Sequence, residues 1–81
     1  MRLEIITPDK TVFKGDVDSA TFPGAKGSFQ VLKNHAAIIS TLVQGTVKYK
    51  IKENAQEITV TGGVVEVLNN HIILLAEGII Q

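Results

Sequence analysis

The chain has 81 residues, of which 44% are hydrophobic, and this length and composition predict a single globular domain over residues 1–81. Eight Lys and Arg balance eight Asp and Glu, so the basic excess typical of nucleic-acid-binding proteins is missing. The absence of cysteine excludes disulfides, thiolate metal ligands and thiol nucleophiles. No apolar run approaches the roughly 20 residues of a membrane helix, and the N-terminus has no signal-peptide core, so we expect a soluble protein.

The first part of the chain reads as short strands separated by turn residues. Pro8-Asp9 is expected to form a turn, Gly15 a hinge, and Pro23-Gly24 the end of a strand. The strands predicted between these breaks are Arg2–Thr7, Thr11–Lys14, Asp16–Phe22 and Ser28–Leu32.

The segment His35–Leu42 (HAAIISTL) fits two structures. Its two alanines, and the helical spacing of Ile38, Ile39 and Leu42, are compatible with a helix. The same isoleucines, followed by Ser and Thr, suit a strand equally well. We favour a turn at Asn34-His35 that is followed by a short strand.

The second half of the chain shows a clear period of two. In Thr46–Glu53, three apolar side chains alternate with lysines, which predicts a strand with one buried face and one lysine-coated face. Glu53–Ala55 is expected to connect it to a strand at Gln56–Thr61. Two further strands, Val64–Leu68 and His71–Glu77, are joined by Asn69-Asn70, since asparagine tolerates the left-handed backbone of a tight hairpin turn. Together these elements predict an all-β sandwich or barrel.

Two motifs suggest chemistry but fit a structural role better. The loop from Gly24 to Gly27 contains a lysine, as a phosphate site would, but it lacks the longer glycine loop and the Lys-Ser/Thr that open a helix in such sites. We therefore interpret both glycines as residues that supply unusual backbone angles. Asp16 and Asp18 are two positions apart, so on a strand they would share a face, where they are more typical of a solvated edge than of acid–base catalysis.

His35 could act as a base or a metal ligand, and neither role finds partners in the sequence. Ser40 and Thr41 follow it without the spacing of a catalytic triad. The other histidine, His71, belongs to a different predicted hairpin, while a metal site needs three or four ligands. The lysines at 48, 50 and 52 make only a weak positive field. We therefore expect an interaction protein, with a free-standing small β-barrel that binds a ligand or nucleic acid as the alternative.

The ordered set of motifs resembles one known family. It begins with LEIITP at Leu3, continues through VFKGDV at Val12, and includes PGAKGSFQVLKNHAAIISTLVQG at Pro23. It closes with GGVVEV at Gly62 and an Asn-Asn hairpin before ILLAE. Over essentially its full length, the chain resembles the N-terminal domain of the epsilon subunit of the F-type ATP synthase. The resemblance implies a flattened antiparallel β-sandwich of about ten short strands.

The resemblance also implies a function without catalysis, cofactor or metal. A subunit of this type sits in the rotor at the foot of the central stalk and joins the gamma subunit to the c-ring, so that proton-driven rotation supports ATP synthesis. It is peripheral, held at the cytoplasmic face of the bacterial inner membrane only through the complex, and it binds neither nucleic acid nor a small-molecule substrate.

Specific positions carry over from the family by their place in the motifs. The loop formed by Ala25, Lys26, Gly27 and Ser28 would contact the c-ring, and Thr7, His35 and Ser40 would face gamma. This chain has Ser28 where family members commonly have a glutamate, so the expected contact loses a charge. The C-terminal helical hairpin, which inhibits ATP hydrolysis in the family, is not expected in these residues.

Overall fold

The computed structural model describes residues 1–80, so that Gln81, the last residue of the expected domain, lies outside the described residues. Residues 1–80 form ten strands and no helix. None of them therefore belongs to a helix that is long and apolar enough to cross a membrane. The strands are β1 (Arg2–Ile6), β2 (Thr11–Asp16), β3 (Ser19–Gly24), β4 (Gly27–Leu32), β5 (Ile38–Leu42), β6 (Gly45–Ile51), β7 (Asn54–Val60), β8 (Gly63–Leu68), β9 (His71–Ala76) and β10 (Ile79–Ile80).

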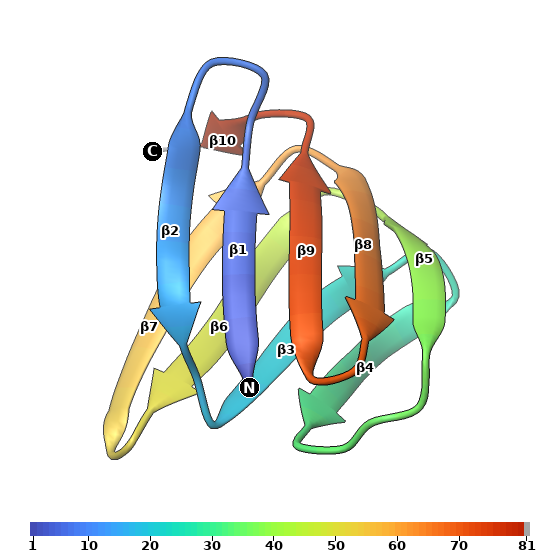
Figure 1. Ribbon diagram of the computed structural model, residues 1–81. Helices are drawn as coiled ribbons and strands as arrows, with labels where there is room; N and C mark the ends of the chain where they lie inside the picture. Colours follow the sequence, from blue (N-terminus) through green and yellow to red (C-terminus); the bar gives the residue numbers. More distant parts are fainter. Residues whose placement is uncertain (81) are drawn as a thin grey trace.

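The strands form one continuous sheet that folds over into two layers. Their order is β10-β7-β6-β3-β5-β8-β9-β1-β2, and β4 pairs with β3 outside this path. In Figure 1, β2, β1, β9, β8 and β5 make the layer nearer the viewer, and β7, β6, β3 and β4 cross obliquely behind it. The expected flattened β-sandwich is confirmed. All of its strand pairs are antiparallel except β1–β9, which is parallel.

The core lies between the two layers and is built by the alternation of side chains along each strand. In β9, for example, Ile72, Leu74 and Ala76 are buried, whereas Leu75 between them is 55% exposed. The described chain has no buried polar or charged residue, so the core is held together by apolar packing. The buried side chains are those of Leu3, Ile5, Val17, Ala20, Phe22, Val31, Leu42, Val47, Val60, Val65, Val67, Ile72, Leu74 and Ala76.

The predicted end of one strand at Lys14 and the predicted start of the next at Asp16 were wrong, because contacts with residues distant in the sequence determine where these strands end. Gly15 is not a hinge, since it lies within β2 opposite Leu3 of β1. The chain changes layer two residues later, where Val17 is buried and its N–H donates to the carbonyl of Met1 (2.7 Å). Asp18 follows in the connection rather than on a strand, so it does not share a strand face with Asp16 as predicted.

The tight turns of the second half use the left-handed backbone. Asn69 and Asn70 have φ values of 49° and 62°, which confirms the predicted Asn-Asn turn between β8 and β9. The connection predicted at Glu53–Ala55 was wrong, because the turn between β6 and β7 consists of Lys52 and Glu53, and Asn54 and Ala55 already pair with β6. Lys52 therefore leaves the predicted lysine row and adopts φ 55°. The carboxylate of Asp18 accepts a hydrogen bond from the Lys52 N–H (2.6 Å), which holds this turn against the β2–β3 connection.

The parallel pair joins the two ends of the sequence and carries an ion pair on its outer side. Nε2 of His71 in β9 donates to Oε2 of Glu4 in β1 (2.6 Å), and Nζ of Lys14 lies 3.9 Å from the other carboxylate oxygen. The hydrogen bond from His71 is the largest cause that lowers the pKa of Glu4 below its ordinary value of 4.5. Partial desolvation opposes this shift, and Lys14 supports it.

The inward direction of Leu74 is testable against its exposed neighbour. We expect Leu74→Ala to lower the free energy of unfolding by about 2–5 kcal/mol, because it removes buried methyl groups and leaves a cavity. Leu75→Ala, the matched control on the same strand, is expected to change it by less than about 0.5 kcal/mol. Urea unfolding followed by circular dichroism measures both, and equal effects of the two substitutions would show that the strand register is wrong.

The Glu4–His71 pair predicts a specific acid sensitivity. A carboxylate whose pKa is lowered by folding stabilises the fold above its unfolded pKa and loses this contribution as the pH falls through the folded value. The wild-type melting temperature should therefore exceed that of Glu4→Gln above about pH 4.5, and the difference should shrink as the pH falls below this value. Glu53→Gln, in the exposed β6–β7 turn, serves as the control and should show no such trend. Parallel melting curves for wild type and Glu4→Gln at every pH would contradict the assignment.

Candidate functional site

The predicted c-ring loop is the tip of the β3–β4 hairpin. Ala25 and Lys26 form its two-residue turn between the paired glycines 24 and 27, and the whole stretch from Ala25 to Ser28 is exposed. Gly27 adopts φ +125°, a backbone angle that glycine favours. Gly24 is needed for a different reason, since a Cβ there would lie 2.6 Å from the Gly27 carbonyl oxygen. The predicted backbone role therefore holds for Gly27, whereas Gly24 provides space.

A short contact between the layers places this hairpin against β5. The Ala25 N–H donates to the Thr41 carbonyl (3.0 Å), and the Val43 N–H donates to the Pro23 carbonyl (3.0 Å). Beyond this crossing β4 and β5 pair with different strands, and a hollow of about 600 Å³ opens between them. Its lining residues are Ala25, Lys26, Gly27, Ser28, Phe29, Ile38, Ile39, Ser40 and Thr41.

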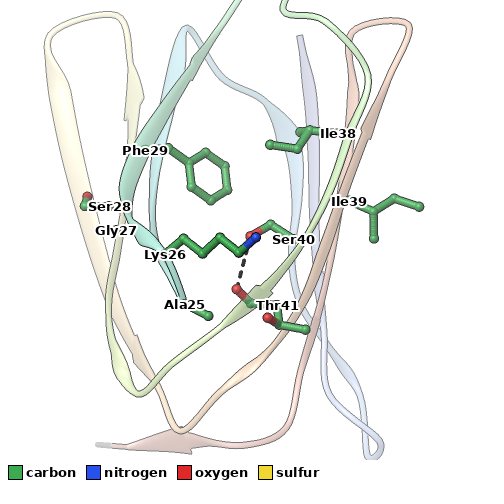
Figure 2. A pocket seen from close by; sticks show the side chains of 9 residues that line it. All are labelled: Ala25, Lys26, Gly27, Ser28, Phe29, Ile38, Ile39, Ser40 and Thr41. Carbon is green, nitrogen blue, oxygen red and sulfur yellow. Dashed lines mark hydrogen bonds between the residues drawn. The ribbon is translucent and has the colours of Figure 1, made fainter.

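Figure 2 shows how these side chains lie. Lys26 extends from the hairpin tip across the hollow toward β5, and Phe29 and Ile38 point toward one another from the two layers. The Ser40 hydroxyl donates to the carbonyl of Thr41 (3.1 Å), whereas Ile39 points away from the hollow. The structure thus brings Ser40, predicted to face gamma, together with the loop predicted to face the c-ring.

His35 lines a different hollow, and it lies in the connection between β4 and β5. Its Nδ1 donates to the Ala36 carbonyl (2.7 Å), and its backbone N–H donates to the Leu32 carbonyl (3.1 Å). That backbone bond closes a turn at Lys33-Asn34, one residue before the predicted Asn34-His35, and Asn34 adopts φ 66° in it. The predicted short strand after the turn is confirmed as β5.

The His35 loop is fastened to the β8–β9 turn by two asparagines. Oδ1 of Asn70 accepts a hydrogen bond from the Asn34 N–H (2.6 Å), and Nδ2 of Asn70 donates to Oδ1 of Asn34 (3.0 Å). The Asn70 carbonyl also accepts a hydrogen bond from the Arg2 N–H (2.9 Å). Asn70 therefore joins the N-terminal strand, its own turn and the His35 loop, a role that the sequence did not indicate.

Thr7 lies far from the other residues predicted to face gamma. It follows the end of β1, where its N–H and hydroxyl both donate to the carbonyl of Lys10 (2.9 and 3.2 Å). The pairings β1–β9, β9–β8 and β8–β5 make β5 run in the same direction as β1. Because His35 precedes β5 while Thr7 follows β1, the two residues lie at opposite ends of the same layer.

The arrangement offers no catalytic constellation around His35. Its hollow is lined by Asn34, Ala36, Ala37, Leu68 and the Asn69-Asn70 turn, and Ser40 is not among the lining residues. Within residues 1–80 there is no group of three or more His, Asp and Glu side chains placed to hold a metal ion.

An apolar surface on the outer face of β5, β8 and β9 was missed. Ile39 is 71% exposed, Leu75 55% and Leu68 51%, and Val64 is also exposed. The strand register places Glu66 between Ile39 and Ile73, so one carboxylate stands within this apolar surface. The sequence carried a signal: HIILLA is apolar at both alternating positions, which is typical of a strand covered on both faces.

Comparison with known families gives a match over the whole chain. The model of the family described as ATP synthase, delta/epsilon chain, β-sandwich domain matches residues 1–81. Proteins named ATP synthase epsilon chain are 40% identical over 79 residues in Nitratiruptor sp. and 36% identical over 77 residues in Leptospira borgpetersenii. The chain spans 61% of the length of each of these relatives. In Chlorobaculum tepidum, the relative of the same name is 40% identical over 76 residues, which cover 93% of this chain and 86% of that protein.

Solved structures share the fold at lower sequence identity. A chain in the central stalk/c-ring structure of the Tetrahymena thermophila mitochondrial ATP synthase superposes with a TM-score of 0.84 and 20% identity, covering 99% of this chain and 65% of that one. A chain in the OSCP/F1/c-ring structure of the Euglena gracilis mitochondrial ATP synthase gives a TM-score of 0.90 at 17% identity, covering 96% of this chain and 51% of that one. At these identities the likeness concerns the fold.

Proposed function

The chain belongs to the family of ATP synthase delta/epsilon β-sandwich domains, and we propose that residues 1–81 form one domain of a non-catalytic rotor subunit that couples gamma to the c-ring. The observation that carries this proposal is the match over the whole chain to that family, together with identities of 36–40% to proteins named ATP synthase epsilon chain. As part of this complex the subunit would support proton-driven ATP synthesis at the cytoplasmic face of the bacterial inner membrane.

Two features of the fold suit a mechanical coupling. The two layers pack against each other through one apolar core, so a relative movement of their strands would break close-packed contacts. The candidate contact residues lie in strands and short connections of this frame rather than in long loops. A torque applied at one surface would therefore be transmitted to another without being absorbed by bending of the domain.

The c-ring contact is proposed at Ala25–Ser28, the exposed tip of the β3–β4 hairpin. Lys26 is the charged residue at this tip, and Ser28 contributes a hydroxyl. The polar surface suits a hydrogen-bonded contact with a polar loop of the ring. Because the tip is anchored to β5 through the Ala25–Thr41 hydrogen bond, its position relative to the core is defined.

The gamma contact is proposed on the layer that contains β5, β8 and β9. His35 lies at one end of this layer and Thr7 at the other, with the exposed Ile39, Leu68 and Leu75 between them. An apolar surface of this kind is typical of a face that is covered in an assembly. Ser40 lines the hollow beside the β3–β4 hairpin and would contribute to the gamma contact from there.

The alternative of a free nucleic-acid-binding barrel is less well supported. Lys48 and Lys50 do lie exposed on β6, as predicted. Lys48, however, is paired in register with Glu57 of β7, and the formal charge of the chain is zero. The positive surface is therefore partly neutralised where it would have to bind phosphates.

Purification of the ATP synthase from the source cells, followed by site-specific cross-linking, tests the proposal. We expect the chain to co-purify with gamma and the c-ring, a Cys at Ser28 to cross-link to the c-ring, and a Cys at His35 to cross-link to gamma. Asn54→Cys, at the far β6–β7 turn, is the control and should give neither product. Absence of the chain from the purified complex would contradict the function, and cross-links from position 28 to the catalytic subunits alone would contradict the surface assignment.

A further inference from the structure

β4 is a free edge of the sheet along its whole length. It pairs with β3 on one side, and no strand of residues 1–80 pairs with it on the other. The residues that flank a two-residue turn form a hydrogen-bonded pair, here Gly24 and Gly27, and such pairs alternate along an antiparallel ladder. The backbone N–H and C=O groups of Ser28 and Gln30 and the N–H of Leu32 therefore point away from β3, toward the open side, whereas the Leu32 carbonyl accepts the hydrogen bond from the His35 N–H.

This edge has none of the devices that usually protect a free strand. Exposed edges tend to carry charged residues, proline or a bulge, which prevent pairing with other chains. β4 reads GSFQVL, without a charge or a proline, and its Leu32 is 52% exposed. By contrast β2, at the end of the sheet order, carries Lys14 and Asp16 and has a bulge against β1. An unprotected edge is expected where another polypeptide covers it.

The hollow beside β4 indicates the chemistry of what would cover it. Phe29 and Ile38 are both half-buried and face one another across it, so it offers room for an apolar side chain. Lys26 is the one charged residue among its lining residues, which include no carboxylate. Lys26 also forms no ion pair within residues 1–80. The hollow thus combines an apolar opening with a single unpaired cation.

We infer that an extended acidic segment of another polypeptide adds to the free edge of β4 as a further antiparallel or parallel strand. Its backbone bonds to Ser28, Gln30 and Leu32, one apolar side chain enters the hollow between Phe29 and Ile38, and a carboxylate pairs with Lys26. The inference rests on the proposed function in one respect, namely that this segment belongs to another subunit of the complex.

A second copy of this chain fits the site less well. Pairing of two β4 strands would bring no acidic residue to the hollow, because GSFQVL contains none. Each Lys26 would then remain without a counter-charge. The complementary occupant is therefore a segment of different sequence in which apolar and acidic residues alternate, as a strand with two different faces requires.

Peptide binding to the full chain tests this inference. The probe is a capped hexapeptide of alternating Val and Glu, and the matched control peptide alternates Val and Lys. In NMR titrations of the ¹⁵N-labelled chain, the Glu peptide should shift the amide signals of Ser28, Gln30 and Leu32 in a saturable way. The Lys peptide should bind at least about fivefold more weakly, because it places like charges at Lys26.

Two substitutions separate the backbone and charge contributions. Lys26→Gln should weaken binding of the Glu peptide about fivefold, whereas Lys48→Gln, on β6, should leave it unchanged. Gln30→Pro removes an edge N–H that does not bond to β3, so it should abolish most binding while the melting temperature shows a folded chain. If this variant does not fold, the comparison of Lys26→Gln with Lys48→Gln decides the question.

Several outcomes would overturn the inference. These are no saturable binding of the Glu peptide, equal binding of both peptides, amide shifts that avoid β4, concentration-dependent dimerisation through β4 in sedimentation experiments, or binding of a single-stranded oligonucleotide that depends on Lys26. None of them would affect co-purification of the chain with gamma and the c-ring, so failure of this inference is distinguishable from failure of the proposed function.

Discussion

The packing of two strand layers against one apolar core is the interaction on which the rest of this structure depends. Phe22 lies fully buried in it, with its ring centroid 5.6 Å from that of Phe29, and the inward residues of both layers surround it. Since the described core holds no polar side chain, the burial of apolar surface must outweigh the conformational entropy that is lost on folding. Strand register, layer crossing and the position of every turn follow from the need to keep one face of each strand inside.

This constraint leaves the turns and the sheet edges as the places where the surface can vary without loss of the core. The β3–β4 hairpin tip, the loop held by Asn34 and Asn70, and the free edge of β4 all lie outside the apolar interior. The exposed apolar face of β5, β8 and β9 is the exception, because there the outward positions are also hydrophobic. The sandwich therefore sets where the proposed contact surfaces lie, while individual side chains set their chemistry.

Local patterns in the sequence were sufficient for most strands and for the Asn69-Asn70 turn. The alternation in TVKYKI predicts β6, and the Asn-Asn pair predicts the left-handed turn before β9, because both depend on neighbouring residues. The break expected at Gly15 was wrong because pairing with β1 continues through this glycine. The parallel register of β1 and β9 likewise depends on residues at opposite ends of the chain, which no local pattern reveals.

The candidate site shows the same division. The exposed turn at Ala25–Ser28 follows from its glycines, but its proximity to Ser40 depends on the single crossing between Gly24 and Leu42. The separation of Thr7 from His35 depends on the directions of four strands, so residues that belong to one predicted surface occupy different ends of it. Family motifs suggest candidate contact positions, whereas the three-dimensional pairing determines which of these positions lie together.

The parallel pairing of β1 with β9 also sets the order in which this chain can complete its fold during synthesis. Arg2 leaves the ribosome early, yet its partner His71 emerges only when nearly all other strands have been made. Such non-local contacts slow folding, because the loop-closure entropy is lost before the contact forms. Until β9 arrives, β1 has only β2 beside it, and this two-stranded ribbon exposes the apolar side chains of Leu3 and Ile5. Until β9 is made, this exposed apolar surface therefore favours aggregation of the partly folded domain.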